Sequence, residues 1–200
     1  MPAAATIETD DSTRRRIIEA AMECFIQLGM AKTSLSDVAR VAGVSRGTVY
    51  RYFDDRQTLI DAVVAAGAEE YFDDAAQAMR AKRSLATQVG AFAQVAAATA
   101  SSHRSPLRLM TGDTALMRII AMGSEESLAR TTEFLRPYVE SAQEKGEVGA
   151  HVDTTEAAEW LARVIMSITS VPSSLSFDIE DPPSVARYVE RFAVAGLGPR

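Results

Sequence analysis

The sequence has few of the residues that build disulfides, metal sites or membrane spans. Its 200 residues include one cysteine, Cys24, and two histidines, His103 and His151. One cysteine forms no internal disulfide, and neither histidine has companions at the spacing of a metal site. No uninterrupted apolar stretch approaches the roughly 18 residues of a membrane span. We expect a soluble chain with no structural metal and no cofactor. The same scarcity leaves no convergent nucleophile and base, which disfavours an enzyme.

The first residues, MPAAATIETDDSTRRR, place acidic side chains before basic ones and contain no apolar run. This order differs from that of a secretory signal, which has a basic start and an apolar core. We expect residues 1–11 to form a short disordered tail and the protein to be cytoplasmic.

Charge is distributed unevenly along the chain. The formal net charge of −6 argues, as an average, against nucleic-acid binding. Residues 12–53, however, contain seven basic and three acidic side chains, so this segment carries +4 and the remainder −10. A basic segment on an acidic body indicates that one part of the chain meets a polyanion while the rest stays away from it.

Apolar residues at steps of three and four predict a first helix over about 13–28, which Gly29 ends. Ser34, with Asp37 three residues later, has the pattern of a capping box for a second helix over about 35–42. Gly43 suits a left-handed turn, and Ser45 can cap a third helix that begins at Arg46. Helix, glycine turn and helix at this spacing predict a DNA-reading helix-turn-helix.

The third helix, over 46–52, presents many polar and aromatic groups. Val49 and Phe53 are expected to face the core. Gly47 is a poor helix former, so its presence favours close approach of another surface, such as a DNA backbone. The alternative is an ordinary exposed helix with a flexible point. The side chains left outside are those of Arg46, Thr48, Tyr50, Arg51 and Tyr52.

Residues 13–60 resemble the N-terminal domain of the TetR family of bacterial transcriptional regulators. The resemblance rests on the AGVS turn, the GTVY and YF signatures and the helix start at TSLSD. It departs at Asp54 and Asp55, where the family commonly has proline, serine or asparagine, and Asp55 can cap the fourth helix.

The resemblance implies three roles on the DNA. Thr33 and Ser34 would meet phosphate, Arg46, Gly47 and Thr48 would lie against base edges, and Tyr50 and Arg51 would hold the backbone. Arg56 stands where the family usually has lysine. The expected DNA-binding set is Thr33, Ser34, Ser45, Arg46, Gly47, Thr48, Tyr50, Arg51, Tyr52 and Arg56.

From Gln57 a long fourth helix is expected to run to about Arg80 and to act as a lever between a DNA-binding domain, 12–55, and a ligand-binding and dimerisation domain, 56–200. The prediction is an all-α chain of about nine helices, because the VGAHV run has no evident partner strand. Later helical patterns lie at about 84–102, near 106, and at 113–122, 125–145, 154–171 and 183–194.

The last two helices have broad apolar faces that carry Trp160 and Phe192 among others. Either these faces are core, or, as the resemblance implies, they pair with a second copy in a four-helix bundle. A two-fold homodimer would place two reading helices about one DNA turn apart on a palindromic operator.

The middle helices offer side chains for a small-molecule pocket, although methionine and aromatic residues at helical spacing also build plain core. Arg163 either pairs with an acidic residue or faces a ligand carboxylate. The candidate effector-binding residues are Phe92, Thr99, His103, Met110, Met117, Phe134, Tyr138, Arg163 and Met166.

These observations favour a ligand-responsive transcriptional regulator, a repressor that a small apolar or amphipathic effector releases from double-stranded operator DNA. The alternative is a ligand-independent architectural DNA-binding protein, which would not need a body three times the size of its DNA-binding module.

Overall fold

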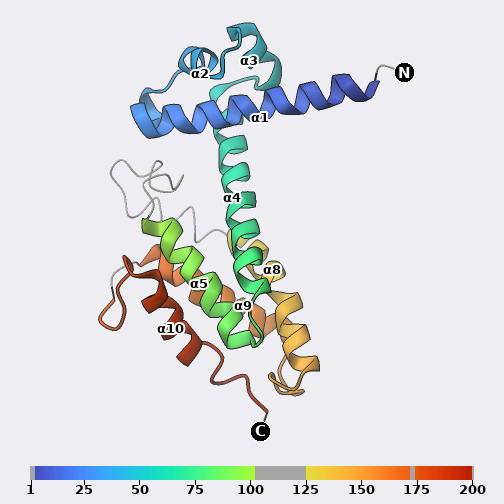
Figure 1. Cartoon of the computed structure of the whole chain (residues 1–200), viewed down its shortest axis with the longest axis vertical. Coiled ribbons are helices and arrows are strands. Elements are labelled where there is room, and N and C mark those ends of the chain that lie inside the picture. The colour runs from blue at the N-terminus through green and yellow to red at the C-terminus, as the bar shows by residue number, and fades with distance from the viewer. Residues whose placement is uncertain (1–2, 102–124, 172–173, 200) are drawn as a thin grey trace. The chain divides into compact units, whose positions relative to one another are not determined.

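The computed structural model describes residues 3–101, 125–171 and 174–199 (Figure 1). Within these ranges the regular structure consists of eight α-helices and one 3₁₀ helix, and no strand is present, so the expected all-α class is confirmed. The VGAHV segment forms turns instead. The expected helices near 106 and at 113–122 lie outside the described residues. None of the helices described is long and apolar enough to cross a membrane.

The chain divides into two compact units, Met1–Glu69 and Glu70–Arg200. The first contains α1 (Ala3–Leu28), η1 (Met30–Lys32), α2 (Leu35–Ala42), α3 (Arg46–Tyr52) and the start of α4 (Arg56–Arg80). The second contains the end of α4, then α5 (Leu85–Ser101), α8 (Glu125–Glu144), α9 (Thr154–Ser170) and α10 (Pro182–Phe192).

Helix α1 begins earlier than the sequence predicted. Residues 1–11 were expected to form a disordered tail, but the helix starts at Ala3. Alanine is the best helix former, and Arg15 pairs with Asp11 one turn before it at 3.5 Å. Further along α1, Ile17, Ala21 and Phe25 are buried as expected.

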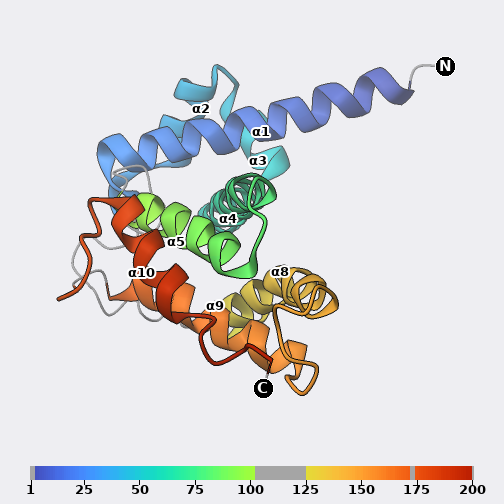
Figure 2. The same cartoon turned by 60° about the horizontal axis from the view of Figure 1, so that its bottom comes forward.

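The core of the second unit is built from small and branched residues on facing helices. Helix α5 packs against α10 and α9, and α9 packs in turn against α8 (Figure 2). Gly90 on α5 lets α10 approach closely, because a Cβ there would meet Glu190 Cγ at 2.4 Å. The side chains that fill this core include Phe92, Leu135, Leu161, Ile165, Val185 and Val189.

Helix α4 serves both units without a break. Its buried residues Leu59, Ile60 and Val63 fall in the first unit, and Ala75 and Met79 join the core of the second. The two compact units therefore meet inside this helix. The functional division at residues 55 and 56 stays a prediction.

Candidate nucleic-acid interface

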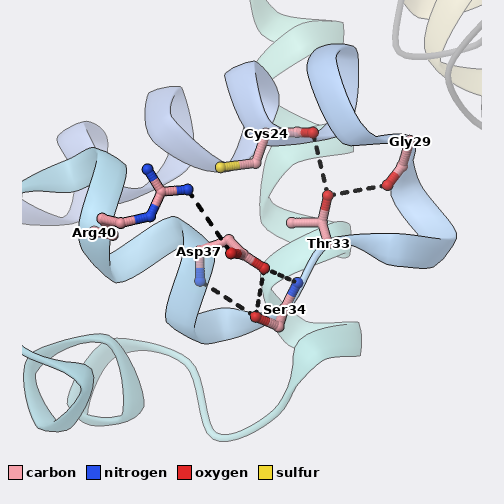
Figure 3. Close-up of polar contacts among 6 residues, drawn as sticks. All are labelled: Cys24, Gly29, Thr33, Ser34, Asp37 and Arg40. Atoms are coloured by element: carbon pink, nitrogen blue, oxygen red, sulfur yellow. Dashed lines mark hydrogen bonds and ion pairs between the residues drawn. The ribbon is translucent and has the colours of Figure 1, made fainter.

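The start of α2 is fixed by a complete capping box (Figure 3). The Asp37 amide donates to Ser34 Oγ at 3.2 Å, and the Ser34 amide donates to Asp37 Oδ2 at 3.0 Å. The Ser34 hydroxyl and amide hydrogen bonds hold the pKa of the Asp37 carboxyl below its usual value of 3.8. The predicted cap is confirmed, and it leaves the Ser34 side chain exposed at the end of α2.

The turn between α2 and α3 has the predicted geometry. Gly43 adopts φ 65° and ψ 35°, the left-handed conformation that L side chains disfavour. Ser45 then caps α3, because its Oγ accepts from the Thr48 amide at 3.0 Å and lies 2.8 Å from the Thr48 hydroxyl. Hydrogen bonds within the chain therefore fix the first turn of α3.

Helix α3 divides cleanly into a buried and an outward face. Val49 and the following Phe53 are almost completely buried, as expected. A Cβ at Gly47 would meet only Ser45 Oγ, at 3.7 Å, so internal packing does not require glycine there. The outward side chains are exposed for Arg46, Tyr50 and Arg51 and half-buried for Thr48 and Tyr52. Helix α3 is therefore short, with hydrogen-bond donors on its outer face and open space beside Gly47.

Thr33 does not lie where a phosphate contact was expected. Its side chain is only 4% exposed. The hydroxyl donates to the carbonyl oxygens of Cys24 and Gly29, 3.2 and 3.0 Å away (Figure 3). Cys24 lies in the last turns of α1 and Gly29 directly follows the helix. Thr33 therefore completes the end of α1 from inside.

Arg56 is likewise engaged internally. Its Nε donates to the Thr33 carbonyl at 3.2 Å, and its Nη2 donates to the Met30 carbonyl. The side chain is half-buried and ties the first residue of α4 to the segment before α2. A phosphate could reach only the remaining N–H groups of this guanidinium.

Asp55, the second of the two aspartates after α3, has a structural role. Asp55 Oδ1 accepts from the amide and the hydroxyl of Thr58, at 2.8 and 2.9 Å. These bonds hold the pKa of Asp55 below its usual 3.8. The expected cap of α4 is confirmed, and it accounts for a carboxylate directly after α3.

An acidic contact to α3 was missed by sequence reasoning. Asp10, near the start of α1, accepts a hydrogen bond from the Tyr52 hydroxyl and lies 3.8 Å from Arg51 Nη2. Arg51 Nη2 also donates to the Tyr52 hydroxyl at 3.0 Å, and its guanidinium stands 4.9 Å from the Tyr52 ring centroid. The available signal was the Asp10–Asp11 pair, which we had assigned to a disordered tail.

In the second unit, three expected effector-binding residues belong to one aromatic cluster. The ring centroids of Phe92 and Phe134 are 5.2 Å apart, and those of Phe134 and Tyr138 are 5.7 Å apart. Tyr71 and Phe72 from α4 extend the cluster, and burial raises the pKa of the Tyr71 hydroxyl. Sequence reasoning omitted these two residues and also Arg130, whose guanidinium lies 5.0 Å from the Phe72 centroid.

Of the other effector candidates, the structure describes Arg163, Thr99 and Met166. Arg163 is exposed, and its Nε donates to Glu159 at 2.9 Å. Of the two alternatives for Arg163, the structure shows the pairing with an acidic residue. Thr99 and Met166 are half-buried on α5 and α9. His103, Met110 and Met117 lie outside the described residues.

Two further features of the second unit concern small-molecule binding. An open groove of about 430 Å³ lies between α4, α5 and α10, with Gln77, Lys82 and Gln94 in its wall. None of the expected effector residues within the described ranges lines it. The hydroxyl of Thr132 on α8 is buried and has no hydrogen-bond partner in the part of the chain that the structure describes.

The outer sides of α9 and α10 carry large exposed apolar side chains. Trp160 is 52% exposed, with its Nε1 donating to the Ala193 carbonyl at 3.0 Å, and Phe192 is 54% exposed. The rings of Phe177, Tyr188 and Phe192 form a chain, with centroids 5.1 and 5.2 Å apart. Exposed aromatic residues in one place are typical of a protein interface.

The capped pair of helices with a left-handed glycine turn defines the first unit as a helix-turn-helix module. Residues 17–63 match the family described as bacterial regulatory proteins, tetR family. The HTH-type transcriptional regulator TtgR of Pseudomonas putida is 42% identical over 59 residues. That match covers 30% of this chain and 28% of the relative, so it spans less than a third of either.

Solved structures extend the likeness in fold to the second unit. A TetR transcriptional regulator from Chloroflexus aurantiacus superposes with a TM-score of 0.66 at 18% identity, covering 96% of this chain and all of the other. The TetR family regulator CifR in complex with 26-bp double-strand operator DNA gives 0.62 at 16% identity, over 89% and 95% of the two chains. Residues 17–63 therefore match the DNA-binding domain of the tetR family, and the chain as a whole shares the fold of these solved regulators.

Proposed function

We propose that this protein is a ligand-responsive transcriptional repressor that binds a palindromic operator as a homodimer in the cytoplasm. It carries out no chemical reaction of its own. The observation that carries the proposal is the outward face of α3, with its first turn fixed by Ser45 and its exposed arginines beside aromatic side chains.

In this proposal the outward residues of α3 divide the work. Arg46 and Thr48 read base edges in the major groove, Gly47 allows the close approach, and Tyr50 with Arg51 holds the phosphate backbone. Ser34 and Ser45 present the starts of α2 and α3 to phosphate, where helix N-termini favour negative charge. The relative CifR, solved with operator DNA, supports this role for the shared fold.

Footprinting of the DNA upstream of the protein's own gene tests the proposal. The full chain is expected to protect an inverted repeat there. The matched control is the Arg46→Ala, Thr48→Ala double variant, which keeps the buried Val49 and Phe53 and is expected to lose the footprint. A footprint unchanged in the double variant would remove α3 from the reading surface.

We further propose that the outer faces of α9 and α10 form the dimer interface. Trp160, Tyr188 and Phe192 supply exposed aromatic area, while the other sides of the same helices are already buried within the protomer. A dimer doubles the DNA contact that one short helix can make.

The effector is proposed to bind in the second unit beside the aromatic cluster of Phe92, Phe134 and Tyr138. Flat, apolar walls with Arg130 nearby suit an apolar or amphipathic molecule. The effector must prefer the DNA-free conformation, since equal affinity for both would shift nothing. Calorimetry with and without operator measures this, because the coupling of about 1–3 kcal/mol expected for an allosteric pair must act equally in both directions.

A further inference from the structure

We propose that Asp10 is an intramolecular competitor for DNA phosphates: the start of α1 holds a carboxylate against Arg51 and Tyr52 and weakens binding to every duplex. The inference rests on the proposed DNA-binding function of α3. It starts from the hydrogen bond that the Tyr52 hydroxyl on α3 donates to Asp10 on α1, 42 residues earlier in the sequence.

Both side chains that Asp10 contacts, Arg51 and Tyr52, belong to the expected DNA-binding set, and both are engaged. A tyrosine hydroxyl has one proton to donate, and that of Tyr52 is donated to Asp10. Arg51 directs Nη2 at the Tyr52 oxygen, 3.0 Å away, and at Asp10, 3.8 Å away. A phosphate oxygen needs the same proton and the same guanidinium edge, because carboxylate and phosphate are recognised by the same fork of donors.

The contact is also placed where exchange is easy. The side chains of Arg51 and Asp10 are 67% and 62% exposed, so water and DNA can reach both. Ion pairs at such exposure are weak, and a polyanion with many phosphates can displace a single carboxylate. The contact is therefore a modest penalty on binding, applied equally to all sequences because it involves no base.

The neighbouring Asp11 provides a matched control. It also carries a carboxylate at the start of α1, but it pairs with Arg15 on the same helix and contacts no residue of α3 among its described contacts. Asp10→Asn and Asp11→Asn change the net charge equally at adjacent positions. A general field effect would act on both variants alike, whereas direct competition acts through Asp10 alone.

The experiment measures binding of the full chain to a short fluorescent duplex of scrambled sequence over a series of salt concentrations. Asp10→Asn is expected to bind about two- to five-fold more tightly than Asp11→Asn. The slope of log affinity against log salt should also steepen by about one unit, the contribution of one additional phosphate contact. Tyr52→Phe together with Asp10→Asn should lose part of the gain, because the released hydroxyl is then absent.

Equal affinities and equal slopes for Asp10→Asn and Asp11→Asn would overturn the inference and leave the proposed function standing. If neither the parent nor any variant bound a duplex, the proposed function itself would fail, and this inference with it. Matching thermal midpoints confirm that the two variants are compared as folded proteins.

Discussion

The contacts within the first unit differ in kind from the contacts within the second. In the first, the features that prepare the DNA-facing surface are local: Ser34 bonds Asp37, Ser45 bonds Thr48 and Asp55 bonds Thr58, each three residues apart. In the second, the features that would sense a molecule come from separate helices, as when Phe72, Phe92 and Phe134 meet. The proposed DNA-reading surface therefore depends on short local motifs, and the proposed effector site depends on packing between helices.

The largest effect should come from the proposed dimer face on α9 and α10. Phe192→Glu places a charge among exposed aromatic rings and is expected to convert the dimer to monomer. Operator affinity should then fall toward the non-specific level, by about 10³-fold or more. Leu175→Glu is the control, because Leu175 is fully exposed and makes none of the ring contacts found on α10. Light scattering and operator titration measure both properties, and a Phe192→Glu dimer with intact affinity would place the interface elsewhere.

Within the first unit, base readers and backbone holders should separate. Arg46→Ala should reduce discrimination by roughly 1–3 kcal/mol at one base pair of each half-site, because a base contact is lost. Tyr50→Phe should weaken all sites by a similar factor, since a phosphate contact carries no sequence information. Titration against a set of single-base operator variants measures the difference. Identical profiles for the two protein variants would contradict the division of roles.

In the second unit, the adjacent threonines of α8 are a matched pair. Thr132 Oγ1 is buried and has no partner among the described residues, whereas Thr131 donates to the Ser127 carbonyl at 2.8 Å. Thr132→Val should raise the free energy of unfolding by about 1 kcal/mol, because a buried polar group without a hydrogen bond destabilises the fold. Thr131→Val should lower it by a similar amount. Denaturant titration tests the pair, and destabilisation by Thr132→Val would show that its hydroxyl is used.

The smallest effect concerns the carboxylate caps of the first unit. Asp37 and Asp55 both have a pKa below the usual 3.8, so their contribution to stability is complete above that value and is lost as pH falls through the folded pKa. The melting temperature should therefore decline below about pH 4. The Asp37→Asn, Asp55→Asn double variant should show a shallower decline in a circular dichroism melt series. Parallel curves for parent and double variant would mean that the caps do not set the acid response.

The local motifs could be predicted from sequence because their partners are three residues away. The Ser34 capping box, the left-handed Gly43 and the Ser45 cap are all confirmed. Thr33 could not be assigned in the same way, since the carbonyl it completes belongs to Cys24, nine residues earlier. The internal partner of Arg56 could not be predicted either, because Met30 lies 26 residues away.

In the second unit, periodicity predicted the helices but not their contacts. Phe92, Phe134 and Tyr138 were named as candidate walls, and the structure joins them through ring contacts. Tyr71, Phe72 and Arg130 were omitted, because their positions along α4 and α8 do not reveal which neighbouring helix they face. Such contacts depend on tertiary packing, so the effector region was the least predictable part of the chain.

Selection from a library of random duplex DNA with the full chain tests directly whether a dimer reads DNA through α3. The bound pool should converge on an inverted repeat. The centres of its two half-sites should lie one helical turn apart, about 10 bp, or a multiple of that distance. The Arg46→Ala, Thr48→Ala double variant should not enrich that sequence. A pool without any enriched repeat, or the same repeat enriched by the double variant, would contradict the reading of DNA by α3 in a dimer.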